Sequence, residues 1–119
     1  MKDRPIALLV SNNLMFLPRI EAAAGSYLKV QRATSIKDLV KIEQNRLSIV
    51  IIDLEFDNAK WEPVLIKLKA SNKENLRFVA YGPHEDKNLM NQAKKLGCDP
   101  VLSKGAFVNQ LRKILRPDG

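Results

Sequence analysis

Apolar residues occur in five short runs along the chain, and each run stops at polar or turn-forming residues. Four of the runs are nearly unbroken, which is typical of strands in a parallel sheet that helices cover on both faces. The run at 29–33 is more polar, as expected of a strand at the edge of the sheet. The five predicted strands are Ile6–Val10, Lys29–Ala33, Leu47–Ile52, Leu76–Tyr81 and Val101–Leu102.

The intervals after the first two strands carry apolar residues at helical spacing. The first interval contains Pro18, which must lie in the first turn of its helix because proline has no backbone N–H to donate. The second interval opens at Ser35 with a sequence similar to a capping box and continues with Leu39, Val40 and Ile42. We therefore expect a helix in each of these intervals.

The last three intervals have equally clear helix signals. The third helix is predicted to begin near Glu62–Pro63, since proline is favoured in a first turn. The fourth is predicted to begin near Asp86 and to end at Gly97, a typical residue just beyond a helix. The fifth is predicted over 107–115.

Strict alternation of strands and helices predicts one α/β domain over residues 1–119. Right-handed crossover connections would then build a three-layer (βα)5 sandwich around a five-stranded parallel sheet. The expected strand order is 2-1-3-4-5, with the switch in connection direction between strands 1 and 3. In such sheets the functional residues gather where the strands end.

The composition argues against a membrane protein and against a metal-binding protein. No apolar run approaches the ~18 residues that span a bilayer, and the apolar run near the start is too short for a signal peptide, so we expect a cytoplasmic protein without membrane contact. Cys98 is the only cysteine and His84 the only histidine, which predicts no zinc site, no metal and no cofactor.

The formal net charge of +7 raises the question of nucleic-acid binding. The lysines and arginines are scattered, however, and no block of five or more occurs. The chain also has no glycine-rich phosphate loop and only seven aromatic residues. Both features argue against nucleic acid as the partner.

Polar residues follow the strands at the predicted carboxyl edge. Ser11 and Asn12 follow the first strand, Asp53 the third, Ala80 lies at the end of the fourth, and Lys104 follows the fifth. In this order of elements and residues, the chain resembles response-regulator receiver domains of the chemotaxis-regulator type over essentially its whole length. The resemblance implies a flavodoxin-like fold, with Asp53 at the phospho-accepting position and Lys104 at the position of the family's lysine.

Several residues depart from the family pattern. Ser11 and Asn12 stand where the family has an acidic pair, and Ala80 stands at the position taken as that of its Ser or Thr. Gly105 and Asp57 replace prolines. Receivers need a magnesium ion for phosphoryl transfer, and magnesium prefers carboxylate ligands, so weak or no magnesium binding is expected. The resemblance is therefore to a degenerate pseudo-receiver without catalytic residues.

These features predict a non-catalytic signalling module that acts by protein–protein contact. The contact face is expected at the fourth predicted helix, the fifth strand and the fifth helix, which would suit an acidic partner or a symmetric homodimer. Its candidate contact residues are Tyr81, Asn91, Lys95, Arg112 and Lys113.

Two alternatives remain open at this point. Asp53 could be the phosphoacceptor of an atypical two-component receiver, with Glu55 and Asp57 replacing the lost acidic pair as metal ligands. The chain could also be a basic, nucleic-acid-associated regulator. For the leading hypothesis we expect Asp53 to form an ion pair with Lys104 at the edge of the sheet.

Overall fold

The computed structural model describes residues 4–71 and 73–116. Five parallel strands form one sheet in the order β2-β1-β3-β4-β5, which confirms the predicted fold class and strand order. The strands are β1 (Ile6–Val10), β2 (Lys29–Ala33), β3 (Leu47–Asp53), β4 (Arg77–Gly82) and β5 (Val101–Ser103). All residues of β1 are buried, whereas only Ala33 of β2 is buried, as expected for a central strand and an edge strand.

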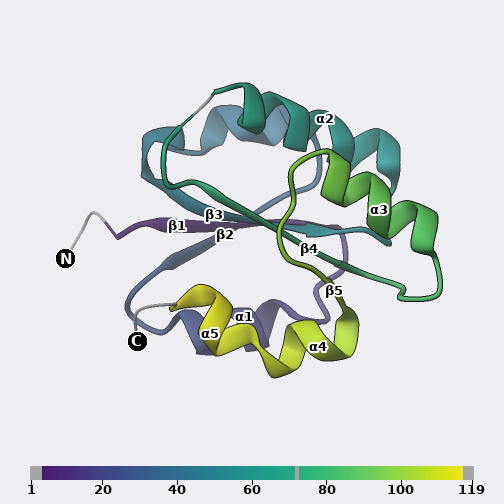
Figure 1. Cartoon of the computed structure of the whole chain (residues 1–119). Helices are drawn as coiled ribbons and strands as arrows, with labels where there is room; N and C mark the ends of the chain where they lie inside the picture. The colour runs from purple at the N-terminus through teal and green to yellow at the C-terminus, as the bar shows by residue number, and fades with distance from the viewer. Residues whose placement is uncertain (1–3, 72, 117–119) are drawn as a thin grey trace.

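Helices cover both faces of the sheet (Figure 1). The α-helices are α1 (Leu17–Ala24), α2 (Asn58–Ala70), α3 (Lys87–Lys95), α4 (Lys104–Asn109) and α5 (Leu111–Leu115), and two 3₁₀ segments are η1 (Ile36–Lys41) and η2 (Gln44–Arg46). One core cluster packs α2, α3 and η1 on one face around Trp61. The other packs α1, α4 and α5 on the opposite face around Phe107. Among the described residues, no helix is both long and apolar enough to cross a membrane.

The second predicted helix is wrong in type, because η1 is a 3₁₀ helix and not an α-helix. Ser35 makes no side-chain capping bond; instead the Asp38 carboxylate accepts a hydrogen bond from the Thr34 backbone N–H at 2.7 Å and another from its hydroxyl at 3.1 Å. A 3₁₀ helix has three residues per turn, so successive side chains diverge more than in an α-helix. Leu39 is therefore buried while its neighbour Val40 is 87% exposed.

The start of α2 is also earlier than predicted. The carboxylate of Asp57 caps the helix by accepting a hydrogen bond from the Ala59 N–H at 3.0 Å. Pro63 therefore lies inside the helix and not in its first turn. The fourth predicted helix is confirmed as α3, with Asp86 accepting from the Leu89 N–H at 3.0 Å, whereas the fifth is divided into α4 and α5 at Gln110.

Candidate functional site

Asp53 is the last residue of β3 and lies at the carboxyl edge of the sheet. Its side chain is buried, with 4% of the residue exposed. The Ser11 hydroxyl donates a hydrogen bond to Oδ2 at 2.7 Å, and the Glu55 backbone N–H donates to Oδ1 at 2.9 Å. Both carboxylate oxygens are thus engaged by neighbouring groups of the chain.

Ser11 and Asn12 follow β1 but differ in their surroundings. Ser11 is fully buried, and its oxygen also accepts a hydrogen bond from the Asn13 N–H at 3.0 Å, so the hydroxyl joins the loop after β1 to Asp53. Asn12 is exposed, and no contact between its side chain and Asp53 is found. The structure therefore brings one of these two predicted residues into the site.

The residue beside Asp53 on the neighbouring strand is Tyr81 and not Ala80. The register of β3 and β4 pairs Asp53 with Tyr81 and Ile52 with Ala80. Because successive side chains of a strand point to opposite faces, Ala80 packs with Trp61 in the cluster under α2 and α3. The prediction of Ala80 as a pocket residue is wrong, and Tyr81 is the residue of β4 that lies beside Asp53.

Tyr81 is enclosed by aromatic rings. It stacks on Phe107 of α4 with 4.4 Å between ring centroids, and Phe16 meets it edge-on at 5.3 Å. Burial raises the pKa of the Tyr81 hydroxyl, and the nearby Asp53 carboxylate raises that pKa further. With 2% of the residue exposed, Tyr81 cannot be the partner contact that the sequence predicted.

Lys104 is the first residue of α4, and its ammonium group pairs with the carboxylate of Glu55. The predicted ion pair between Lys104 and Asp53 is therefore wrong. Lys104 is linked to Asp53 only through Glu55, whose backbone N–H binds Asp53. Both side chains of the observed pair are about 40% exposed, so the pair contributes only about 0–1 kcal/mol to stability.

The acidic residues at this edge do not fit a magnesium ion. Such an ion needs several hard oxygen ligands that are free to face it. The oxygens of Asp53 accept two internal hydrogen bonds, Glu55 pairs with Lys104, and Asp57 caps α2. Within residues 4–71 and 73–116, no group of three or more His, Cys, Asp or Glu side chains is arranged to hold a metal.

The other predicted contact residues are exposed but lie on separate surfaces. Asn91 and Lys95 are exposed on α3, which lies beside β5 on one face of the sheet. Arg112 and Lys113 are exposed on α5, which packs against α1 on the other face (Figure 1). Arg112 lines a groove with Arg19 of α1 and is therefore on the α1 side of α5.

Cys98 lies outside this site. The residue is buried, and burial raises the pKa of its thiol to about 12, so the thiol is neutral at physiological pH. This agrees with a packing role for the single cysteine.

Gly82 at the end of β4 permits a close approach of the loop that follows Asp53. The Leu54 N–H donates to the Tyr81 carbonyl at 2.8 Å, and a Cβ on residue 82 would lie 2.8 Å from the Leu54 Cβ. We expect Gly82→Ala to lower the free energy of unfolding by about 1–3 kcal/mol through overpacking. Urea denaturation measures the change.

Gly105→Ala is the matched control for this prediction, because a Cβ at that position of α4 meets nothing within 4 Å. Alanine favours a helix over glycine, so this variant should be neutral or stabilised by up to about 1 kcal/mol. Equal effects of the two substitutions would contradict the close contact at Gly82.

Comparison with known proteins finds structural neighbours only. No protein-family model and no curated protein matches the chain. The signal receiver domain of the putative response regulator NarL from Mycobacterium tuberculosis superimposes with a TM-score of 0.73 at 12% identity, covering 96% of this chain and 94% of that one. The phosphorylated cyanobacterial phytochrome response regulator RcpA gives 0.70 at 17% identity, covering 96% and 90%.

A third neighbour is a response regulator from Burkholderia pseudomallei, whose structure contains a phosphorylated aspartic acid, a calcium ion and citrate. It matches with a TM-score of 0.71 at 18% identity over 93% of this chain, which spans 66% of the length of that protein. Identities this low establish a shared architecture and leave activity open. The chain has the fold of response-regulator receiver domains.

Proposed function

We propose that this chain is a non-catalytic signalling module of receiver fold that binds a partner protein and does not use magnesium-dependent phosphorylation of Asp53. The observation that carries the proposal is the state of Asp53, which is buried and hydrogen-bonded through both oxygens to Ser11 and Glu55. A module of this kind would act in signalling through the partner protein that binds it.

Phosphoryl transfer to an aspartate makes two demands on the site. A carboxylate oxygen must reach the phosphorus in line with the leaving group, and cationic groups must neutralise the charge on the transferred phosphoryl group. Here Asp53 is only 4% exposed, and both of its carboxylate oxygens accept hydrogen bonds. The lysine ammonium at this edge is paired with Glu55, so neither demand is supported.

Protein contact is supported by exposed polar residues on two separate surfaces. Asn91 and Lys95 on α3 and Lys113 on α5 are exposed, and the chain carries a formal net charge of +7. An acidic protein surface complements such a charge. A symmetric homodimer through α3, β5 and the last helices is the second candidate assembly; the NtrC4 receiver domain, another structural neighbour, was observed as a beryllofluoride-activated dimer.

Titration with magnesium, followed by beryllofluoride, tests the proposal directly. Amide NMR signals of Ser11, Asp53 and Tyr81 should show no saturable shift below about 10 mM magnesium, because too few free carboxylates are present. Beryllofluoride should then leave the spectrum unchanged. Saturation at sub-millimolar magnesium, or a shift of these signals with beryllofluoride, would identify the atypical phosphoacceptor instead.

The double variant Ser11→Asp, Asn12→Asp is the matched control. It introduces carboxylates at the two positions after β1 where receivers carry acids, of which position 11 contacts Asp53. Its signals should respond to magnesium in a range in which the natural sequence gives none. That difference would show that the natural sequence does not respond to magnesium because it lacks these two carboxylates.

A further inference from the structure

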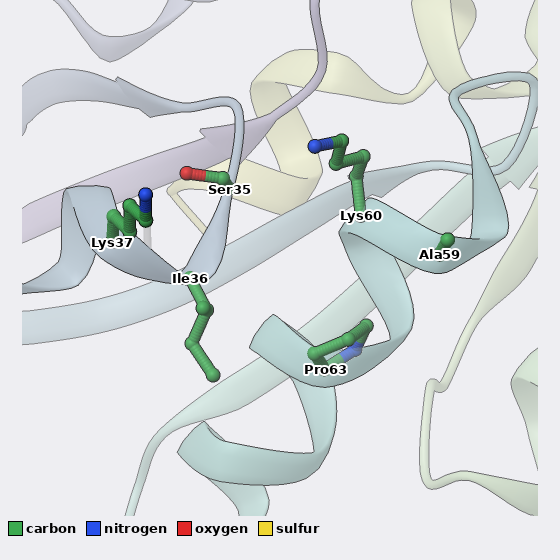
Figure 2. Close-up of a pocket in the computed structure, with 6 residues that line it drawn as sticks. All are labelled: Ser35, Ile36, Lys37, Ala59, Lys60 and Pro63. Atoms are coloured by element: carbon green, nitrogen blue, oxygen red, sulfur yellow. The ribbon is translucent and has the colours of Figure 1, made fainter.

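A groove lies between η1 and α2, beside the first residues of both helices (Figure 2). Its volume is about 280 Å³, close to the lower end of the ~300–1,000 Å³ of pockets that enclose small-molecule ligands or cofactors. A groove of this size suits one or two side chains of a partner. It is lined by Ser35, Ile36, Lys37, Ala59, Lys60 and Pro63.

The walls of the groove expose apolar surface. Ile36 is 42% exposed, and its side chain extends beside α2 on the same side as Pro63 (Figure 2). One turn further along each wall, Val40 on η1 and Ile66 on α2 are 87% and 50% exposed. Within the groove itself, Ile36 and Pro63 provide the larger apolar side chains of the lining.

The charged side chains that line the groove are two lysines. Lys37 and Lys60 line it from opposite walls, and neither forms an ion pair with a described residue. The nearby acids are engaged elsewhere. Asp38 binds Thr34, Asp57 caps α2, and Glu62 accepts a hydrogen bond from Gln92 at 2.5 Å.

Polar groups of the lining are also available to a partner. Pro63 has no N–H, so the carbonyl of Ala59, four residues earlier in α2, lacks its α-helical donor. Ser35 lies at the start of η1, and its hydroxyl makes no capping bond. Ser35 and Ala59 both line the groove.

We propose that this groove binds an acidic segment of a partner protein, with one aliphatic side chain seated between Ile36 and Pro63 and flanking carboxylates at Lys37 and Lys60. The inference rests on the proposed function and names the chemistry of its partner. Charge complementarity selects the acidic segment, and the exposed aliphatic wall requires an apolar residue within it.

Two synthetic hexapeptides with blocked ends test the proposal by amide NMR. The probe is Glu-Glu-Leu-Leu-Glu-Glu, and Glu-Glu-Ser-Ser-Glu-Glu is its apolar-deficient control. The leucine peptide should shift the signals of Ser35, Lys37 and Lys60, and the serine peptide should bind at least about tenfold more weakly because it buries no aliphatic surface. Equal binding of the two peptides, or no shift at millimolar peptide, overturns the proposal.

Charge-reversal variants locate the binding. Lys37→Glu, Lys60→Glu should weaken binding of the leucine peptide about tenfold or more, since two attractive pairs become repulsive. Lys29→Glu, Lys94→Glu makes the same change in charge at two exposed lysines that do not line the groove, and this variant should bind as the natural sequence does. The four side chains are exposed, and unchanged Trp61 fluorescence would show that both variants fold.

The outcomes separate this inference from the proposed function. Shifts that map to α3 and α5 and disappear in Arg112→Glu, Lys113→Glu overturn the groove but retain a protein-binding module. A single-stranded oligonucleotide that binds the groove more tightly than the leucine peptide overturns the acidic protein segment as its occupant. A response of Asp53 to beryllofluoride overturns the proposed function without moving the peptide signals.

Discussion

Replacing Phe107 by alanine is expected to lower the free energy of unfolding by about 3–5 kcal/mol. Phe107 is fully buried in α4, stacks on Tyr81 and lies 6.0 Å from the Phe16 ring, centroid to centroid. Truncation would therefore remove the apolar contacts of one ring and leave two others facing a cavity. Denaturation monitored by Trp61 fluorescence measures the loss, because Trp61 belongs to the core cluster on the opposite face and reports global unfolding.

Phe107→Leu is the control for this expectation. Leucine retains most of the apolar volume, so the variant should lose only about 1–2 kcal/mol. If Phe107→Ala cost no more than Phe107→Leu, the three aromatic rings would not pack as described, and Tyr81 would not be held beside Asp53.

Asp53→Ala is expected to destabilise the fold by about 2 kcal/mol. The substitution leaves the backbone N–H of Glu55 without its acceptor, and the buried hydroxyl of Ser11 keeps only a longer hydrogen bond to the Asn13 carbonyl at 3.3 Å. Each buried unsatisfied donor costs about 1–3 kcal/mol, and relief from burying a carboxylate offsets part of the sum. Urea denaturation of the variant and of the natural sequence gives the difference.

Asp53→Asn and Asp57→Ala are the comparisons for this prediction. The amide oxygen of asparagine still accepts one of the two hydrogen bonds, so Asp53→Asn should cost about 1 kcal/mol. Asp57→Ala removes the exposed cap of α2 and should also cost about 1 kcal/mol. A stabilising Asp53→Ala would show instead that the site stores repulsion, as a crowded carboxylate site does.

The strands could be predicted from the sequence because an unbroken apolar run has few alternatives in a covered parallel sheet. Helix type and helix start were harder to predict. Val40 was expected to continue an α-helical pattern, but the Asp38–Thr34 hydrogen bonds accompany a 3₁₀ turn that leaves it exposed. Proline is favoured in a first turn, so Pro63 predicts a later start, yet the Asp57 cap begins α2 earlier and the helix continues through the proline.

At the site, residue positions could be predicted from the sequence, but side-chain faces and ion-pair partners could not. Asp53, Ser11 and Lys104 were correctly placed at the carboxyl edge, since strand order alone determines which loops meet there. Neighbouring residues of a strand point to opposite faces of the sheet, so an alignment error of one residue exchanges the two faces. The sequence alone predicts Ala80 beside Asp53, whereas the strand register places Tyr81 there. The partner of Lys104 depended on side-chain reach, and Glu55, two residues beyond Asp53, was the nearer acid.

Intact-mass spectrometry after incubation with acetyl phosphate and magnesium is the most direct test of the central claim, which is that Asp53 does not work as a phosphoacceptor. Asp53→Asn treated in parallel distinguishes Asp53 from any other site of modification. We expect the natural sequence to keep its mass, because its carboxylate is buried and bonded to Ser11 and Glu55. A gain of one phosphoryl group that Asp53→Asn abolishes would contradict the account.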